Sequence, residues 1–187
     1  MSHRLEASSI ASPRTLPTAA RADVLVGGGT VAACAAALEA RSRGASVYLA
    51  APRLYLGDDR CGTLLLWRDD DAATGDAPLL DDLFGSEPVT TPLLVKRTLA
   101  RRLLDAGVTI RMGCLPVGAV VDDDGAVRGA VLADRSGRRA VVAGAVIDAT
   151  RHALVARPVE SDSRTAPSTI TARCIVLGGE PELDAGA

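Results

Sequence analysis

The stretch that decides the fold is DVLVGGGTVAACAAALEARSRGASVYLAA, residues 23–51. It begins with a short apolar run at 23–26, which is typical of a buried parallel strand. Three glycines at 27–29 end that run, and the alanine-rich residues 30–43 predict a helix. A glycine follows the helix, and residues 46–50 predict a second strand. The pattern is therefore that of a β-α-β unit with a glycine turn.

The glycine turn is a candidate phosphate site. Gly27, Gly28 and Gly29 lack a Cβ atom, so a ligand can approach their backbone closely. The helix that follows presents unpaired N–H groups and the positive end of its dipole at the same point. Such a point stabilises a pyrophosphate group, so the unit predicts a dinucleotide-binding fold.

Composition narrows the classes of partner. Hydrophobic residues make up 48% of the 187 residues and aromatic residues only 2%, so the core must be built from small aliphatic side chains. The net charge of −2, with both signs interspersed, argues against a nucleic-acid surface. No apolar run approaches the roughly 20 residues that span a bilayer. We expect neither nucleic acid nor membrane as a partner.

The four cysteines are widely spaced and have few histidines near them. This pattern argues against a metal site and a disulfide framework, and favours reduced thiols in a cytoplasmic protein. Residues 1–22 lack the continuous apolar core of a secretory signal and are expected to form a flexible N-terminal extension.

Further elements follow the β-α-β unit. Residues 52–85 are expected to be irregular, with a solvated acidic run at 69–71. The next helix is expected to start at Thr91-Pro92, with an apolar stripe drawn from Leu93, Leu94, Leu99, Leu103 and Leu104. Strands are predicted at 108–112, in a three-stranded antiparallel meander at 115–121, 126–133 and 138–142, and at 145–150 and 169–177.

This order of elements resembles the N-terminal half of the FAD-dependent oxidoreductases with a glutathione-reductase-like FAD domain. The similar subfamily reads DVxVVGGGPAG, then ER-x-x-x-LGG, then VIDATGD, and the resemblance covers residues 23–179. It implies an α/β fold, with a Rossmann-like parallel sheet, the glycine turn and the meander. It also implies a domain at 23–151 that binds FAD, with residues 152–187 as a linker and the first strand of a substrate domain.

The resemblance carries a cofactor site onto this chain. Gly27 and Gly29 match the first two glycines of the family motif, and Ala32 stands at the third, where a small residue allows close helix–strand packing. The residues implied to line the FAD site are Gly27, Gly28, Gly29, Thr30, Val31, Ala32, Ala51, Arg53, Gly57, Cys61, Thr63, Val117, Ala149 and Thr150.

Four positions depart from the family pattern. Ala51 replaces the carboxylate that accepts hydrogen bonds from the adenosine ribose, and Asp58 replaces the second glycine of LGG. A carboxylate at 58 would repel the pyrophosphate or flavin end of FAD unless it is paired, and Arg60 is a candidate partner. Arg151 and His152 replace the final Gly-Asp, where they would either contact a phosphate or block the site.

Catalytic residues are not identifiable. Cys61 is expected to be an ordinary packing cysteine rather than a redox thiol, because no second cysteine lies near it in sequence. For His152, a surface or capping position is favoured over contact with a ligand. Trp67 could cover a ligand or a partner, but no second residue supports either role.

Three functions remain open. The first is the FAD-domain chain of a flavin-dependent oxidoreductase, in which a second chain supplies the rest of the substrate domain around a small-molecule substrate. The second is a non-catalytic subunit that has lost FAD and supports a partner. The third is a module for NAD(P) or ADP, for which Arg53 would accept a 2′-phosphate.

Overall fold

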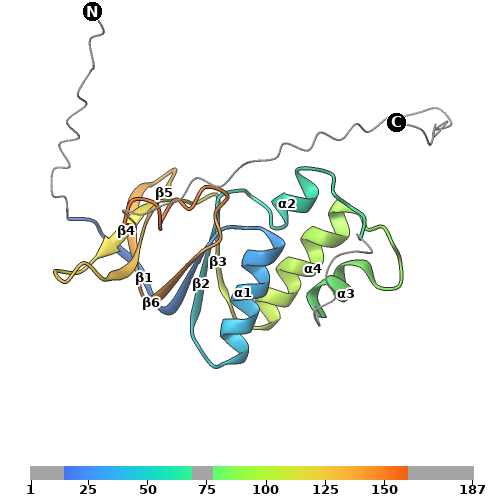
Figure 1. The fold of residues 1–187 in the computed structure, drawn as a ribbon, viewed down its shortest axis with the longest axis horizontal. Helices are drawn as coiled ribbons and strands as arrows, with labels where there is room; N and C mark the ends of the chain where they lie inside the picture. Colours follow the sequence, from blue (N-terminus) through green and yellow to red (C-terminus); the bar gives the residue numbers. More distant parts are fainter. Residues whose placement is uncertain (1–14, 69–77, 160–187) are drawn as a thin grey trace, which may run out of the picture.

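The computed structural model describes residues 15–68 and 78–159, and these build a six-stranded sheet with its helices on one side (Figure 1). The strand order is β3-β2-β1-β6-β5-β4. The elements are β1 (Thr18–Gly27), α1 (Val31–Ser42), β2 (Val47–Ala51), α2 (Asp58–Cys61), α3 (Pro78–Phe84), α4 (Pro92–Asp105), β3 (Thr109–Met112), β4 (Leu115–Val121), β5 (Val127–Asp134) and β6 (Gly137–Asp148). The predicted α/β class with a parallel sheet and a meander is confirmed.

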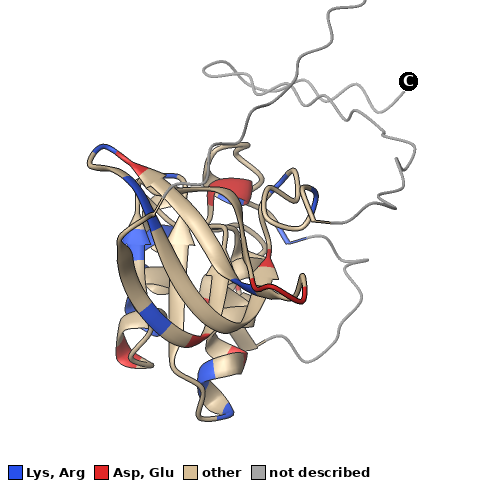
Figure 2. Cartoon of the chain, turned by 90° about the vertical axis from the view of Figure 1, so that its left-hand side faces the viewer, with Lys and Arg blue, Asp and Glu red and all other residues tan. Residues whose placement is uncertain are grey.

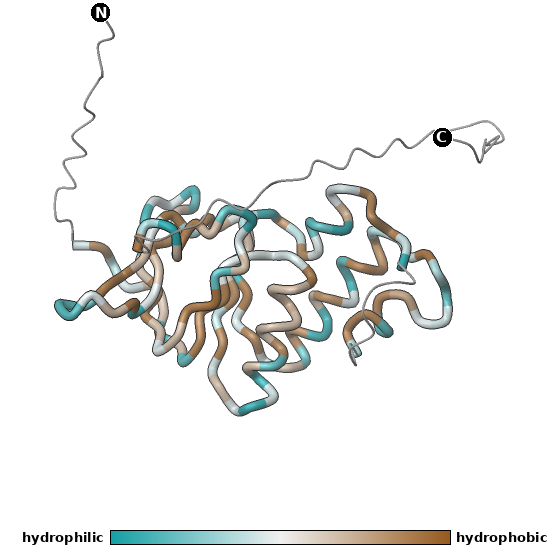
Figure 3. The backbone as a smooth tube through the Cα atoms, in the orientation of Figure 1, coloured by the Kyte–Doolittle hydropathy of each residue, from teal (hydrophilic) through white to brown (hydrophobic). Residues whose placement is uncertain are grey.

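Strand β1 lies inside the parallel half of the sheet, between β2 and β6. Its side chains alternate between two cores: Val26 packs under the helices, whereas Leu25 faces the opposite side. Both faces are covered, and this explains why the run 23–26 is apolar without the polar alternation of a one-sided strand. The coloured tube of Figure 3 shows apolar segments on these central strands.

Two predicted strands, 138–142 and 145–150, are one continuous strand, so the expectation of separate elements was wrong. Strand β6 pairs antiparallel with β5 and parallel with β1. Gly144 does not break it, because β1 runs alongside and continues the ladder. Strand β1 for the same reason begins at Thr18, where residues 18–22 pair with β6. The expected extension at 1–22 therefore includes residues that belong to the sheet.

The sheet folds back on itself. Arg111 on the edge strand β3 forms an ion pair of 2.7 Å with Asp134 on β5, although three strands separate these two in the sheet order. A second core fills the space between the two halves, with Leu25 and Ala50 packed in one cluster with Ala130 and Leu132. The antiparallel half therefore covers the face of the parallel half that the helices leave open.

The helix layer holds the larger core. Helix α4 buries Val95, Leu99 and Leu103, spaced four residues apart. The expected stripe was partly wrong, because Leu93 and Leu104 are 65% and 64% exposed. The segment 52–85 is also less irregular than expected, since it contains α2 and α3.

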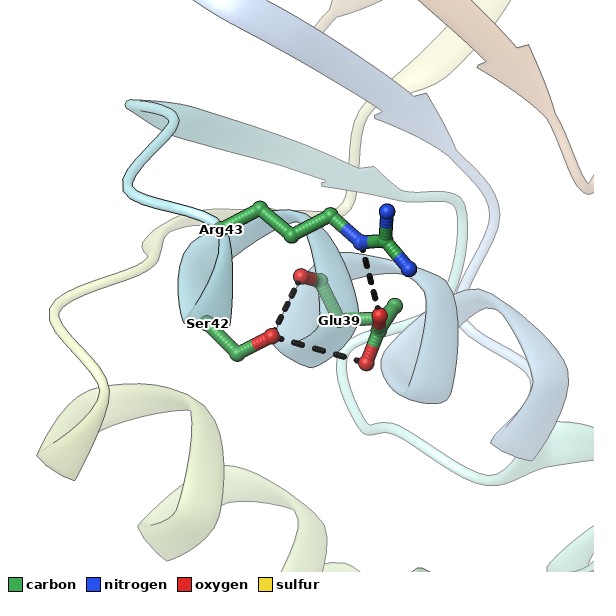
Figure 4. Close-up of polar contacts among 3 residues, drawn as sticks. All are labelled: Glu39, Ser42 and Arg43. Carbon is green, nitrogen blue, oxygen red and sulfur yellow. Dashed lines mark hydrogen bonds and ion pairs between the residues drawn. The ribbon is translucent and has the colours of Figure 1, made fainter.

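Helix α1 is capped at both ends. Thr30 accepts a hydrogen bond from the Ala33 N–H at the start. At its end, the Ser42 hydroxyl bonds to the Glu39 carbonyl at 2.8 Å, and Arg43 pairs with the Glu39 carboxylate at 2.8 Å (Figure 4). The Ser42 and Arg43 contacts are exposed and contribute little to stability. Both signs of charge occur on the face shown in Figure 2.

Some expectations lie outside the described residues. They are the form of residues 1–14, the acidic run at 69–71 and the strand at 169–177. Among the residues that the structure describes, no helix combines the length and the apolar character needed to cross a membrane.

Candidate functional site

The glycine turn is fixed between the ends of two neighbouring strands. The Gly27 carbonyl accepts a hydrogen bond from the Ala149 N–H at 2.8 Å, and the Gly28 N–H donates to the Ala50 carbonyl at 2.9 Å. Gly28 has φ +134°, and a Cβ atom there would lie 2.6 Å from the Ala149 oxygen. Only glycine fits this position, for reasons of both conformation and space.

The segment that precedes α2 lies directly against this turn. The Gly57 N–H donates to the Gly29 carbonyl at 2.6 Å. Gly57 has φ +75°, and a Cβ atom on it would lie 2.7 Å from the Val95 side chain on α4. Gly57 therefore lets the chain pass between the glycine turn and α4, and this places α2 beside the start of α1.

The start of α1 has both free and occupied donors. Among the described residues, nothing accepts a hydrogen bond from the backbone N–H of Gly29 or Thr30. The Val31 N–H, however, donates to a carboxylate oxygen of Asp59 at 3.0 Å. One donor that was expected to face a phosphate is thus already bonded to an anion from the same chain. Sequence reasoning missed this role of Asp59.

Asp58, the neighbour of Asp59, has a buried oxygen without a partner. Its Oδ1 atom is inaccessible and makes no hydrogen bond within the described part of the chain. This oxygen lies 3.8 Å from where a Cβ on Gly29 would be. Arg60, the candidate partner from the sequence, does not pair with it. Arg60 instead donates to the Trp67 carbonyl at 3.1 Å and lies over the Phe84 ring.

The end of β2 has no acidic group. Ala51 is fully buried, and its Cβ lies 3.1 Å from the position of a Cβ on Gly29. Arg53 is exposed, and its guanidinium makes no hydrogen bond or ion pair to any described residue. The structure thus places Ala51 against the glycine turn, and the exposed Arg53 follows two residues later.

The end of β6 forms a second wall, which Asp148 organises. Its carboxylate accepts hydrogen bonds from the backbone of Thr150, Val155 and Ala156 and from the Thr150 hydroxyl, at 2.6–3.0 Å. Burial alone would raise the pKa of Asp148, but these bonds outweigh it and the pKa lies below its usual value. The Thr150 methyl lies 3.6 Å from the position of a Cβ on Gly27. Sequence reasoning placed Thr150 in the site but missed the role of Asp148.

Other predicted site residues lie further out. Ala32 is exposed and lines a groove beside α1, so the expected packing of Ala32 against a strand was wrong. Val117 is 41% exposed on β4, next to Pro116, whose ring lies 3.3 Å from the position of a Cβ on Gly27. Thr63 is exposed, and its hydroxyl donates to the Asp59 carbonyl.

Cys61 has the features of a packing residue. Its thiol lies 3.6 Å from the Pro92 carbonyl, and burial raises its pKa. A thiol with a raised pKa is a poor nucleophile, in agreement with the expectation from sequence. Arg151 and His152 are both exposed on the turn after β6, and Trp67 forms an isolated bridge with Val89.

A groove of about 950 Å³ runs along the outer face of α1. It extends from Val31 and Asp59 to Ser42, and its far wall comes from α3 and the end of α4. A smaller cavity of about 170 Å³ lies on the other face of the sheet, beside Tyr48, Arg139 and the Arg111–Asp134 pair. No cluster of metal-ligating side chains occurs within residues 15–68 and 78–159.

These elements define a Rossmann-type nucleotide-binding protein. A glycine turn, a helix N-terminus and the carboxyl ends of parallel strands meet at one point, where such folds bind the phosphates of their ligand. The chain belongs to the FAD-dependent oxidoreductase family, whose model matches residues 23–166. No curated protein is significantly similar to it.

Solved structures share the fold. THI4 from Thermovibrio ammonificans aligns with 71% of this chain and 58% of its own, at 19% identity and TM-score 0.54. A 3-ketosteroid-delta4-(5alpha)-dehydrogenase from Rhodococcus jostii aligns over 76% and 47%, at 16% identity and TM-score 0.52. A flavocytochrome c3 fumarate reductase aligns over 70% and 34%, at 20% identity and TM-score 0.52. The chain spans at most 58% of the length of these three.

Family membership supports FAD as the cofactor, and the residues of the turn fit it. The unbonded N–H groups of Gly29 and Thr30 match a diphosphate, and the glycines leave room for it. The unpartnered Asp58 oxygen is an acceptor that lacks a donor. Asp59 is the exception, because its carboxylate occupies the Val31 N–H.

Proposed function

We propose that this chain is the FAD domain of a flavin-dependent oxidoreductase of the glutathione-reductase-like type. The observation that carries the proposal is the pair of unbonded N–H groups at Gly29 and Thr30, which lie in the turn between β1 and α1 of a chain that belongs to the FAD-dependent family. Bound FAD would supply the redox chemistry, and the chain would bind and orient it.

Each wall of the site would have its own task. The turn at Gly28 and Gly29 would hold the diphosphate by backbone N–H groups, which need no side chain and bring no steric bulk. The end of β2 would face the adenosine through Ala51, with an exposed arginine, Arg53, at the rim. Ala149 and Thr150, held by Asp148, would form the wall toward the flavin.

We further propose that a second chain completes the enzyme. It would supply the rest of a substrate domain around a small-molecule substrate, in a cytoplasmic hetero-oligomer. One observation supports this proposal. Leu93 and Leu94 are adjacent in the first turn of α4 and are 65% and 45% exposed, and contiguous exposed apolar surface marks contact sites.

A second candidate is a non-catalytic subunit that keeps the fold without FAD. Asp59 favours it, because a carboxylate on the Val31 N–H satisfies the helix end without a nucleotide. Ala51 favours it as well, since it offers no acceptor to a ribose. This candidate predicts a stable chain that stays colourless in the presence of excess FAD.

The visible absorption spectrum of the chain separates the two candidates. The chain is incubated with FAD, passed through a desalting column and then denatured. The proposal predicts flavin absorption that travels with the protein, is released on denaturation and is lost when ADP competes. A colourless protein, both alone and with its co-purified partner, would contradict it. Size-exclusion chromatography of the isolated chain tests the partner: a monodisperse monomer with full oxidoreductase activity would contradict the second chain.

A further inference from the structure

Asp59 meets the start of α1 in the way that a phosphate would. Its carboxylate accepts a hydrogen bond of 3.0 Å from Val31, the first residue of the helix. The first turn of α1 contains no acidic residue of its own, so Asp59 supplies the negative charge that stabilises the positive end of the helix. The charge comes from α2, a separate element that lies next to the glycine turn.

We propose that Asp59 is an internal substitute for the diphosphate of FAD, and that it must leave the Val31 N–H before the cofactor binds. The inference rests on the proposed function, because it concerns the same site. An N–H group forms one strong hydrogen bond, so the carboxylate and the diphosphate compete for it. The Asp59 carboxylate and the diphosphate would also repel each other, because both are negatively charged and would share one N–H group.

We call the arrangement in which Asp59 bonds to the Val31 N–H the closed position of α2. Two further contacts hold α2 there. Gly57 donates to the Gly29 carbonyl at 2.6 Å, and the Thr63 hydroxyl donates to the Asp59 carbonyl. Helix α2 spans only residues 58–61 and has no fully buried residue, although Cys61 packs against the helix-side core and Arg60 donates to the Trp67 carbonyl. A short element without a fully buried residue can shift with the loss of few contacts.

The environment of Asp58 makes the closed position of α2 less stable than it would otherwise be. In the closed position its Oδ1 atom is inaccessible and has no partner, which is unfavourable for a carboxylate. Withdrawal of Asp59 would move Asp58 too, because the residues are adjacent on α2. The Asp58 oxygen would then reach water or a hydroxyl group of the nucleotide. The closed position thus carries the unfavourable free energy of an unpaired, buried Asp58 oxygen, and nucleotide binding would remove it.

The test is a calorimetric titration of the chain with FAD and, separately, with ADP. Four proteins are compared: wild type, Asp59→Ala, Asp59→Asn and the control Asp123→Asn, which removes an exposed carboxylate from the turn between β4 and β5. Loss of a competing charge-assisted hydrogen bond predicts that Asp59→Ala binds both ligands about ten- to a hundred-fold more tightly. Asp59→Asn keeps an acceptor without the charge and should lie between Asp59→Ala and wild type, while Asp123→Asn should match wild type.

Each outcome decides the question. If wild type and Asp59→Ala bind FAD equally, or the variant binds more weakly, the inference is wrong and the proposed function stands. If no protein binds FAD or ADP, both fail. If wild type does not bind FAD and either Asp59 variant does, Asp59 blocks the site completely in the native chain; that result supports the inference and contradicts the proposed function. Circular dichroism confirms that the variants are folded, and Asp59→Asn decides the outcome if Asp59→Ala is not.

Discussion

The carboxylate of Asp59 and the backbone N–H of Val31 lie 3.0 Å apart, although 28 positions separate them in the chain. The contact joins α2 to α1 at the end of the glycine turn. It places a negative charge where the fold otherwise receives the phosphates of a nucleotide. Cofactor binding in this chain is therefore a competition with one of its own side chains.

The glycine turn has no room for a Cβ atom at Gly28, so adding one methyl group there should lower stability strongly. Gly28→Ala should lower the free energy of unfolding by about 3 kcal/mol or more, since the added Cβ meets a backbone oxygen as well as an unfavourable φ. Gly85→Ala is the matched control, with φ +58° and no atom within 4 Å of its Cβ. It should cost only about 1 kcal/mol. Urea denaturation measures both, and equal losses would show that the contact with Ala149 is not restrictive.

Restoring the family pattern at the adenosine end needs two changes together. Ala51→Glu alone should lower stability and not tighten FAD binding, because it adds a buried carboxylate near Asp58, whose Oδ1 atom lies against Gly29 as Ala51 does. The double variant Ala51→Glu/Asp58→Gly has room and a single new acceptor for the ribose. It should bind FAD about ten-fold more tightly than wild type. Fluorescence titration with FAD tests this. Tighter FAD binding by Ala51→Glu alone would contradict the argument that the carboxylates at 51 and 58 interfere with each other.

Asp148 should make stability depend on pH. Its folded pKa is lowered, so its contribution is present above its ordinary pKa of about 3.9 and is lost as the pH falls through the folded value. Asp148→Ala should lower the free energy of unfolding by about 2–4 kcal/mol at neutral pH. The difference between wild type and Asp148→Ala should shrink below about pH 4. A difference that stays constant down to acid pH would show that the charge of Asp148 is not involved.

Thr90 offers a stabilising change. It is 4% exposed, and its hydroxyl has no hydrogen-bond partner among the described residues. Thr90→Val removes an unsatisfied polar atom and keeps the shape, so it should raise the free energy of unfolding by about 1 kcal/mol. Thermal unfolding of the two proteins measures this. A lower melting temperature for Thr90→Val would indicate that the hydroxyl bonds to water or to a residue outside the described ranges.

The β-α-β unit could be read from sequence because its signals are local. The apolar run at 23–26, the three glycines and the alanine-rich helix each constrain the backbone within a few residues. The family motif likewise placed Ala51, Gly57 and Thr150 at the turn, and the structure brings all three there.

The rest depends on contacts between distant segments. Strand β6 continues past Gly144 because β1 pairs with it on both sides of that residue, and nothing in residues 143–145 signals this. Arg60 bonds to the Trp67 carbonyl rather than to its neighbour Asp58, since the chain turns back after α2. The role of Asp59 follows from where α2 packs. Two consecutive aspartates have no spacing that predicts such a contact.

The most direct test of the account follows the amide signal of Val31 by NMR during a titration with FAD. The account predicts that the Val31 signal shifts as FAD binds, together with those of Gly29 and Thr30, and that the side-chain carboxyl signal of Asp59 shifts at the same ligand concentration. In Asp59→Ala the Val31 signal should move before FAD is added and should saturate at lower FAD. FAD binding that leaves the Val31 amide and the Asp59 carboxyl unchanged would contradict the account.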